Sequence, residues 1–127
     1  DVDLNEPPSI ELDDWFGVQQ ANIEVNYTIS DINNDVINLH CEYSTDSISW
    51  SDATVLGAVN NITVYDSSLT WFSIDDLGEA PLQPYYFRIT PSDNDVGIPG
   101  KNRVFVANNN LPPGANVLIA FATISYC

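Results

Sequence analysis

The chain has 127 residues, 44% of them hydrophobic, and its 18 acidic side chains against three basic ones give a formal net charge of −15. This length corresponds to one domain, which buries about two-thirds of the surface of its unfolded chain. The scarcity of Lys and Arg argues against nucleic acid as a partner, because a phosphate backbone binds through clustered cations, and it disfavours anionic membrane surfaces for the same reason.

Short strands separated by turn-forming residues run through most of the chain. Residues 1–8 end in a pair of prolines and are predicted to form an extended arm or linker. Strands are predicted at residues 9–12, 21–29, 37–43, 48–50, 54–56, 61–65, 69–72, 85–90 and 101–107. Residues 75–83 alone have some helical character, and a glycine and two prolines limit it to a turn at most.

The clearest pattern is a hairpin at residues 35–50. Apolar and polar side chains alternate along its first strand, which gives that strand one buried and one wet face. A run of turn formers follows at 44–47, and the alternation then resumes as far as Trp50. We expect this hairpin to form the middle of the core, with Trp50, Trp71 and Phe87 as the large side chains that fill it.

Strands every 8–12 residues, with turn chemistry between them, predict an all-β protein folded as an antiparallel β-sandwich of about seven or eight strands. The predicted organisation has an N-terminal arm at 1–8, the sandwich at 9–110, and a Pro-Pro junction with an apolar strand at 111–127.

The two Pro-Pro pairs, at 7–8 and 112–113, are separated by about the length of one sandwich. This spacing is typical of a tandem array of modules. The strongly apolar residues 114–127 then have two interpretations. They form either a last strand buried in their own domain, or a strand donated to the open sheet of a neighbouring copy, which would build a filament by β-augmentation.

Several short motifs resemble those of fibronectin type III-like repeats, an Ig-like class found in large secreted and cell-surface proteins of microbes. They are Val-Asn-Tyr-Thr-Ile-Ser-Asp at 25–31, Tyr-Ser-Thr-Asp at 43–46 followed by Trp50, Arg-Ile-Thr-Pro-Ser-Asp at 88–93, and Val-Phe-Val at 104–106. The likeness covers about residues 7–113. It implies a fibronectin III/Ig-like sandwich with a spacer or adhesive role and no catalysis. The chain departs from the pattern at Cys41, where an aliphatic residue is expected, and in its apolar tail.

Acidic and amide side chains in two predicted loops offer candidate ligands for calcium. Asp31, Asn33 and Asp35 alternate along the first loop, and Asp93 and Asp95 lie in the second. Calcium binds six to eight hard oxygen atoms, so the two loops would have to meet at one end of the fold. The alternative is that these side chains form Asx-turns with their own backbone.

Two further modifications are predicted. Asn26 and Asn61 lie in N-glycosylation sequons, and an intact mass equal to that of the bare polypeptide would exclude their use. Cys41 and Cys127 allow at most one disulfide, which would tie the C-terminal strand to the core in an oxidising compartment. The alternative is that both are small buried hydrophobic residues.

Catalysis is not expected. His40 is the only histidine, and its place in the alternation predicts a solvent-facing strand residue. Four groups of aromatic residues could form a sugar-stacking platform: Trp15-Phe16, Trp50, Trp71-Phe72 and Tyr85-Tyr86. The favoured alternative is that Trp50, Trp71 and Phe87 fill the core and the others cover its ends.

These observations favour a non-enzymatic, extracellular structural or adhesive module of a cell-surface assembly, whose partners are neighbouring copies or domains and glycans. No cofactor is required, and calcium is the one candidate. The alternatives are a filament or pilus protomer assembled by strand donation, and a carbohydrate-binding module.

Overall fold

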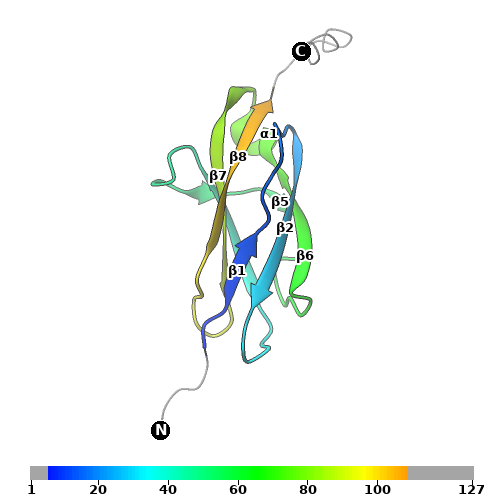
Figure 1. Ribbon diagram of the computed structural model, residues 1–127, viewed down its shortest axis with the longest axis vertical. Helices are drawn as coiled ribbons and strands as arrows, with labels where there is room; N and C mark the ends of the chain where they lie inside the picture. The colour runs from blue at the N-terminus through cyan, green and yellow to red at the C-terminus, as the bar shows by residue number, and fades with distance from the viewer. Residues whose placement is uncertain (1–5, 109–127) are drawn as a thin grey trace.

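The computed structural model describes residues 6–108 and contains two antiparallel sheets of four strands each, so the predicted all-β sandwich is confirmed (Figure 1). The elements in chain order are β1 (Ser9–Leu12), β2 (Asn22–Ser30), β3 (Asn38–Ser44), β4 (Ser51–Asp52), β5 (Val55–Leu56), β6 (Asp66–Phe72), α1 (Ser73–Leu77), β7 (Ala80–Ser92) and β8 (Gly100–Asn108). One sheet has the order β1-β2-β6-β5 and the other β4-β3-β7-β8.

β2 shows how the alternating sequence builds the core. Its inward side chains are all buried: Ile23, Val25, Tyr27 and Ile29. The polar residues between them are exposed, as the pattern predicts. The two sheets meet where Trp71 of β6 packs against Phe87 of β7, with ring centroids 5.1 Å apart and neither residue accessible to solvent.

The buried indole of Trp71 keeps a hydrogen-bond partner. Its Nε1 donates to Oδ2 of Asp76 in α1 at 2.7 Å. The same carboxylate accepts from the backbone nitrogen and the hydroxyl of Thr54, at 2.8 and 2.7 Å. α1 ends at Leu77 and is capped by Gly78, whose φ of +65° suits glycine. This single turn therefore covers one end of the core and satisfies the polar atom of its largest side chain.

The prediction that Trp50 fills the core is wrong. Residues 45–50 form a loop, Ile48 is 81% exposed, and the returning strand β4 begins only at Ser51. Trp50 lies half-buried beneath Arg88, whose guanidinium carbon is 4.1 Å from the ring centroid. A six-residue loop does not preserve the register that a tight turn would impose, so the alternation along the sequence does not predict which face a residue joins.

Two other predicted elements differ from the structure. Residues 61–65 are not a strand, and only Ile62 forms a bridge, to Ile37. β7 begins at Ala80, five residues before the predicted strand at 85–90, and includes Pro81 and Pro84. At Pro84 it pairs with β8 alone, because β3 ends opposite Tyr86. A missing amide hydrogen is tolerated where one side of the strand has no partner.

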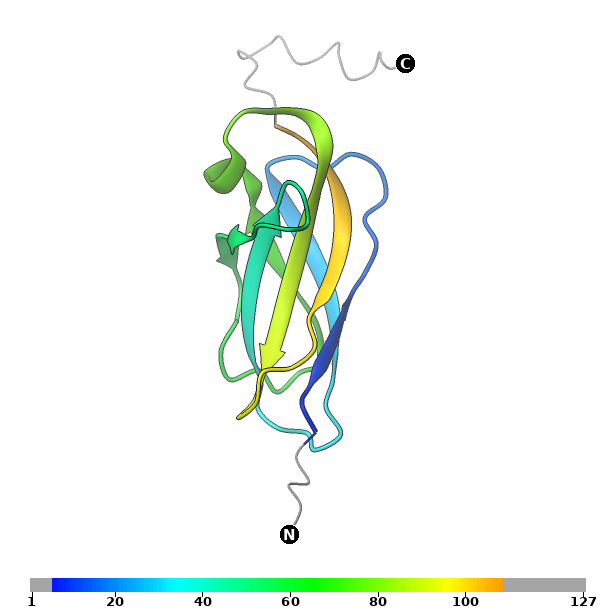
Figure 2. The same cartoon turned by 90° about the vertical axis from the view of Figure 1, so that its left-hand side faces the viewer.

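The chain enters and leaves the sandwich at opposite ends of its long axis. β1 begins at one end, called here the N-terminal pole, and β8 ends at the other, beside α1 (Figures 1 and 2). The β2–β3 and β7–β8 loops both lie at the N-terminal pole (Figure 1). The chain just before β1 is fixed there, because the Glu6 amide donates to Oδ1 of Asn33 at 2.9 Å and the Ile98 amide donates to the carbonyl of Pro8 at 2.8 Å.

Gly97 permits this close approach of the β7–β8 loop to the N-terminal arm. A Cβ atom at this position would overlap the carbonyl oxygen of Pro8 and come within 2.8 Å of that of Pro91. Gly97 does not have the positive φ that favours glycine. Glycine is therefore needed here only because there is no room for a Cβ atom.

We therefore expect Gly97→Ala to lower the free energy of unfolding by about 1–3 kcal/mol, the usual cost of overpacking. Gly17→Ala is the control, because Gly17 has a φ of +77° and open space around its Cβ position, so that only backbone strain of about 1 kcal/mol is expected there. Urea unfolding measures both changes. Equal stability of Gly97→Ala and the wild type would contradict the close packing of arm and loop.

Candidate functional site

Three carboxylates meet at the N-terminal pole. Asp31 and Asp35 come from the β2–β3 loop and Asp93 comes from the β7–β8 loop, and one oxygen of each lies within 4.8 Å of the others. The loops meet because β3 pairs with β7 in a register that sets Asn38 opposite Ser92. Residues just before β3 are therefore neighbours of residues just after β7.

Asp31 is the buried member of the group and is held by its own loop. Its Oδ2 accepts the Asp35 amide at 2.9 Å, and its Oδ1 accepts the Asn33 amide at 3.3 Å. Asn34 has a φ of +57° and donates its amide to the Asp31 carbonyl at 3.0 Å. These hydrogen bonds form the Asx-turn that the sequence analysis gave as the alternative to calcium binding. A carboxylate has about four acceptor positions, so the turn does not use all of them.

The other predicted ligands are placed differently. Asp95 is exposed and does not belong to the group of three, although its amide donates to Oδ1 of Asp93 at 2.8 Å. Asn33 directs Oδ1 to the amide of Glu6. The structure thus gathers three of the five predicted calcium ligands and uses a fourth to hold the N-terminal arm.

The electrostatics of this group follow from its crowding. The pKa of Asp35 is raised by desolvation, by a hydrogen bond with Asp93 that favours the protonated form, and by the negative charges of Asp31 and Asp93. Burial and the same carboxylates also raise the pKa of Tyr65, whose hydroxyl donates to the Asp35 carbonyl at 2.6 Å. Negative charge at this pole therefore costs free energy, which a proton or a cation would reduce.

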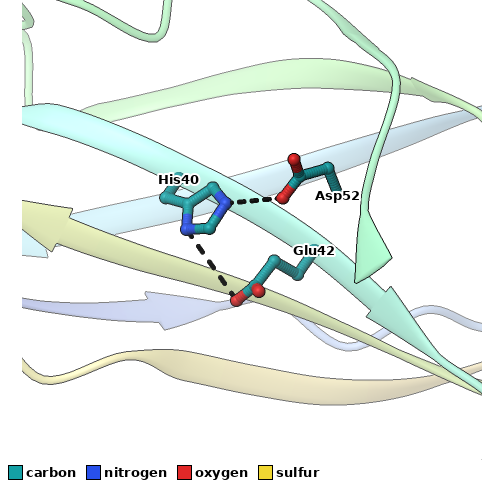
Figure 3. A group of neighbouring side chains, drawn as sticks. All are labelled: His40, Glu42 and Asp52. Carbon is teal, nitrogen blue, oxygen red and sulfur yellow. Dashed lines mark hydrogen bonds and ion pairs between the residues drawn. The ribbon is translucent and has the colours of Figure 1, made fainter. Parts of the chain in front are cut away.

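A second group of metal-ligating side chains lies on the outer face of the β4-β3-β7-β8 sheet (Figure 3). Nε2 of His40 lies 2.8 Å from Oδ1 of Asp52, and Nδ1 lies 4.0 Å from Oε1 of Glu42. The same Glu42 oxygen accepts from Arg88 at 2.7 and 3.1 Å. The two ring nitrogens face different carboxylates, and one ligand atom from each of the three residues lies within 4.8 Å of the others. His40 faces solvent, as predicted.

Cys41 carries a buried free thiol in β3. Burial, assisted by the nearby charge of Glu42, raises its pKa to about 12, so the thiol is protonated and a poor nucleophile at neutral pH. Cys127, its predicted disulfide partner, lies outside the described residues, as do the second Pro-Pro pair and the apolar strand at 114–127. The disulfide stays a prediction.

Both sequons are open to solvent. Asn26 points outward from β2, and Asn61 is exposed in the loop before β6. Exposure is what N-glycosylation requires of an acceptor, and its use at either site stays a prediction.

The predictions from sequence missed two features of the site. Tyr65 beside the acidic group has no sequence signal, because it lies in a segment predicted to be a strand. The outward clustering of Arg88, Lys101 and Trp50 follows from the registers of β7 and β8 and from the loop at 45–50, which periodicity does not fix.

Comparison with models of known protein families and with curated proteins found no match for this chain. Among residues 6–108, no helix is long and apolar enough to cross a membrane. The interpretation of the site therefore depends on its own geometry.

We expect Asp35→Asn to raise the melting temperature at pH 7. The pKa of Asp35 in the folded state lies above its ordinary value of 3.8, so its protonated carboxyl contributes fully to stability below pH 3.8. This contribution to the free energy of unfolding is lost as the pH rises through the folded-state pKa. A neutral side chain avoids this loss. Differential scanning fluorimetry between pH 3.5 and 8 measures the effect, and a lower melting temperature of the variant at pH 7 would contradict it.

Asp46→Asn is the control, for which we expect the opposite change in melting temperature at pH 7. The amides of Ser49 and Ile48 lower the pKa of Asp46, so its contribution to stability is present above its ordinary value of 3.8 and is lost as pH falls through the lower folded pKa. This variant should therefore melt at a lower temperature than the wild type at pH 7.

Proposed function

We propose that the chain is a non-enzymatic, extracellular structural or adhesive module, one of several fibronectin III-like sandwiches that follow one another in a surface assembly. The observation that carries the proposal is the placement of the two ends: β1 begins at one pole and β8 ends at the other (Figure 1). Copies joined end to end would therefore extend along the long axis of each sandwich.

The contacts of both terminal strands support a load-bearing role. At the N-terminal pole the Pro8 carbonyl accepts the Ile98 amide. At the other pole Asn108, the last residue of β8, is 3% exposed; its Oδ1 accepts the Ala21 amide at 2.8 Å, and its Nδ2 donates to the Ser73 hydroxyl at 3.1 Å. Tension between the poles would shear β1 and β8 past their partners, so that several hydrogen bonds resist it together rather than one at a time.

The completeness of both sheets favours this module over a protomer that needs a donated strand. Each sheet has four strands within residues 6–108, and the core between them is closed. The edge strands β4 and β5 have two residues each. β8 is longer, but Gln19 covers part of its edge by donating to the Phe105 carbonyl at 2.8 Å and accepting the Ala107 amide at 3.0 Å. Short or covered edges discourage strand addition.

The surroundings of His40 and Cys41 support a non-enzymatic role. His40 is engaged by carboxylates on an open sheet face, and the Cys41 thiol is buried and protonated. The strong acidity and the two exposed sequons support an extracellular location.

The proposed module also binds calcium at its N-terminal pole. Asp31, Asp35 and Asp93 would provide the carboxylate oxygens, and Asn33 beside them already holds the arm at Glu6. A bound cation would neutralise the crowded charges and join the two loops at the point where the chain enters the module.

Force spectroscopy of concatenated copies of the full chain tests the load-bearing role. Each copy should unfold in a separate step that releases roughly 340 Å of chain, at about 3.3 Å per residue for residues 6–108, less the pole-to-pole length of the folded module. Gly97→Ala, which disturbs the arm at the N-terminal pole, should lower the unfolding force, and Gly17→Ala should lower it less. A featureless extension, or equal forces for both variants, would contradict the role.

Thermal unfolding with and without calcium tests the metal site. Calcium at about a hundred times its dissociation constant would stabilise the fold by about 2.7 kcal/mol, or roughly 10 °C in melting temperature for a domain of this size. The double variant Asp31→Asn/Asp93→Asn should lose this shift, and Asp52→Asn, in the His40 group, should keep it. An unchanged melting temperature of the wild type in millimolar calcium would refute the site.

A further inference from the structure

All the lysine and arginine side chains of this acidic protein lie on the outer face of one sheet. The sequence contains three, Arg88, Lys101 and Arg103. Arg88 of β7 is paired in register with Lys101 of β8, and Arg103 is opposite Tyr86 on the same two strands. Their neighbours along the strands, Phe87 and Val104, point into the core. Positive charge is thus concentrated on one face of a molecule of net charge −15.

Two of these cations are not neutralised by the protein. Arg88 is paired with Glu42, but within residues 6–108 neither Lys101 nor Arg103 forms an ion pair with a carboxylate. Lys101 donates to the Ser47 hydroxyl at 2.9 Å, and the Arg103 guanidinium lies 5.1 Å from the Phe105 ring centroid. Both side chains are exposed. With 18 acidic residues in the chain, this lack of partners leaves the two cations open to an anionic ligand.

Beside Arg103 lies an open groove rich in aromatic side chains. Its volume is about 540 Å³, and Trp15, Phe16, Tyr86 and Phe105 line it together with Arg103. Phe16 is 88% exposed and Phe105 is 40% exposed, although both are large and apolar. Exposed aromatic rings gathered at one place are typical of a binding surface.

The groove is held in place by the backbone on both of its sides. The segment that carries Trp15 and Phe16 is fixed to β2, because the Trp15 indole donates to the Glu24 carbonyl at 2.7 Å. It is fixed to β8 through the two hydrogen bonds of Gln19. Binding would therefore require little ordering of this segment.

A polar pair lies in the same groove. Nδ2 of Asn102 donates to Oδ1 of Asp14 at 2.7 Å. This leaves the second carboxylate oxygen of Asp14 as an acceptor for hydroxyl groups, while Oδ1 of Asn102 accepts the backbone amide of Arg103 at 3.0 Å. Arg103, on the same strand as Asn102, offers a planar guanidinium that fits a carboxylate or a sulfate group.

We propose that this groove binds an anionic polysaccharide. Sugar rings stack on Phe16 and Phe105, sugar hydroxyls donate to the Asp14 carboxylate, and the acidic group of the sugar binds Arg103, with Lys101 at about 6.6 Å further along the strand. A saccharide fits better than an acidic peptide, because it offers hydroxyl donors to Asp14 and an anion to Arg103 on one rigid ring. The inference rests only on the adhesive part of the proposed function.

Titration of the full chain with three polysaccharides tests the proposal, with intrinsic tryptophan fluorescence and calorimetry as the readouts. Polygalacturonate carries carboxylates, dextran sulfate carries sulfate esters, and dextran is neutral. We expect one or both of the anionic polymers to bind and dextran not to bind, and the comparison identifies which acidic group is recognised. Arg103→Gln should weaken that binding about tenfold or more, and Phe16→Ala should weaken it severalfold.

Ile32→Ala is the matched control, because Ile32 is a 77% exposed apolar residue at the N-terminal pole, and its replacement should leave binding unchanged. Equal melting temperatures of all variants exclude unfolding as the cause. The proposal is overturned if neither anionic polymer binds, if Arg103→Gln binds as well as the wild type, or if poly-glutamate binds as tightly as the polysaccharides. Such a result leaves the force and calcium measurements unaffected, so the load-bearing role is tested separately.

Discussion

The pairing of β3 with β7 is the constraint on which the other features of the molecule depend. Its register, from Asn38 opposite Ser92 to Ser44 opposite Tyr86, sets Glu42 opposite Arg88 on the outer face. On the inner face it holds Phe87 against Trp71 of the other sheet. At its end it joins the loops that carry Asp35 and Asp93. A shift of one residue in this register would exchange the buried and exposed faces of a strand and disperse all three groups.

Charge is distributed unevenly around this framework. Carboxylates crowd together at the N-terminal pole, where the pKa of Asp35 is raised, and the lysine and arginine side chains lie on the outer face of β7 and β8. Repulsion among the many other acidic groups opposes the close approach of two copies. The pole and the face are therefore the two places at which this protein would gain most from a cation and from an anion, respectively.

The proposed functions use different parts of the sandwich. In the proposed role, load would pass between the poles through the terminal strands, from the Pro8–Ile98 hydrogen bond to the buried Asn108. Calcium would act at the pole where the chain enters, and a polysaccharide would bind on the side of the sandwich, along β8 and the segment before β2. Because these regions do not overlap, a module in the middle of an array could carry load and still present its groove.

The sequence by itself determined the all-β class, the strands β1, β2, β3 and β8 to within a residue or two, and the two acidic loops, because alternation and turn chemistry are local properties of the chain. Only the tertiary structure decided which loops meet, that Trp50 lies outside the core, and that Arg103 stands beside an aromatic groove. These features depend on register between strands far apart in the sequence, and a loop such as 45–50 changes that register without altering the local pattern. The same reason explains why Asp31, Asp35 and Asp93 could be named individually from the sequence, whereas their convergence required the pairing of β3 with β7.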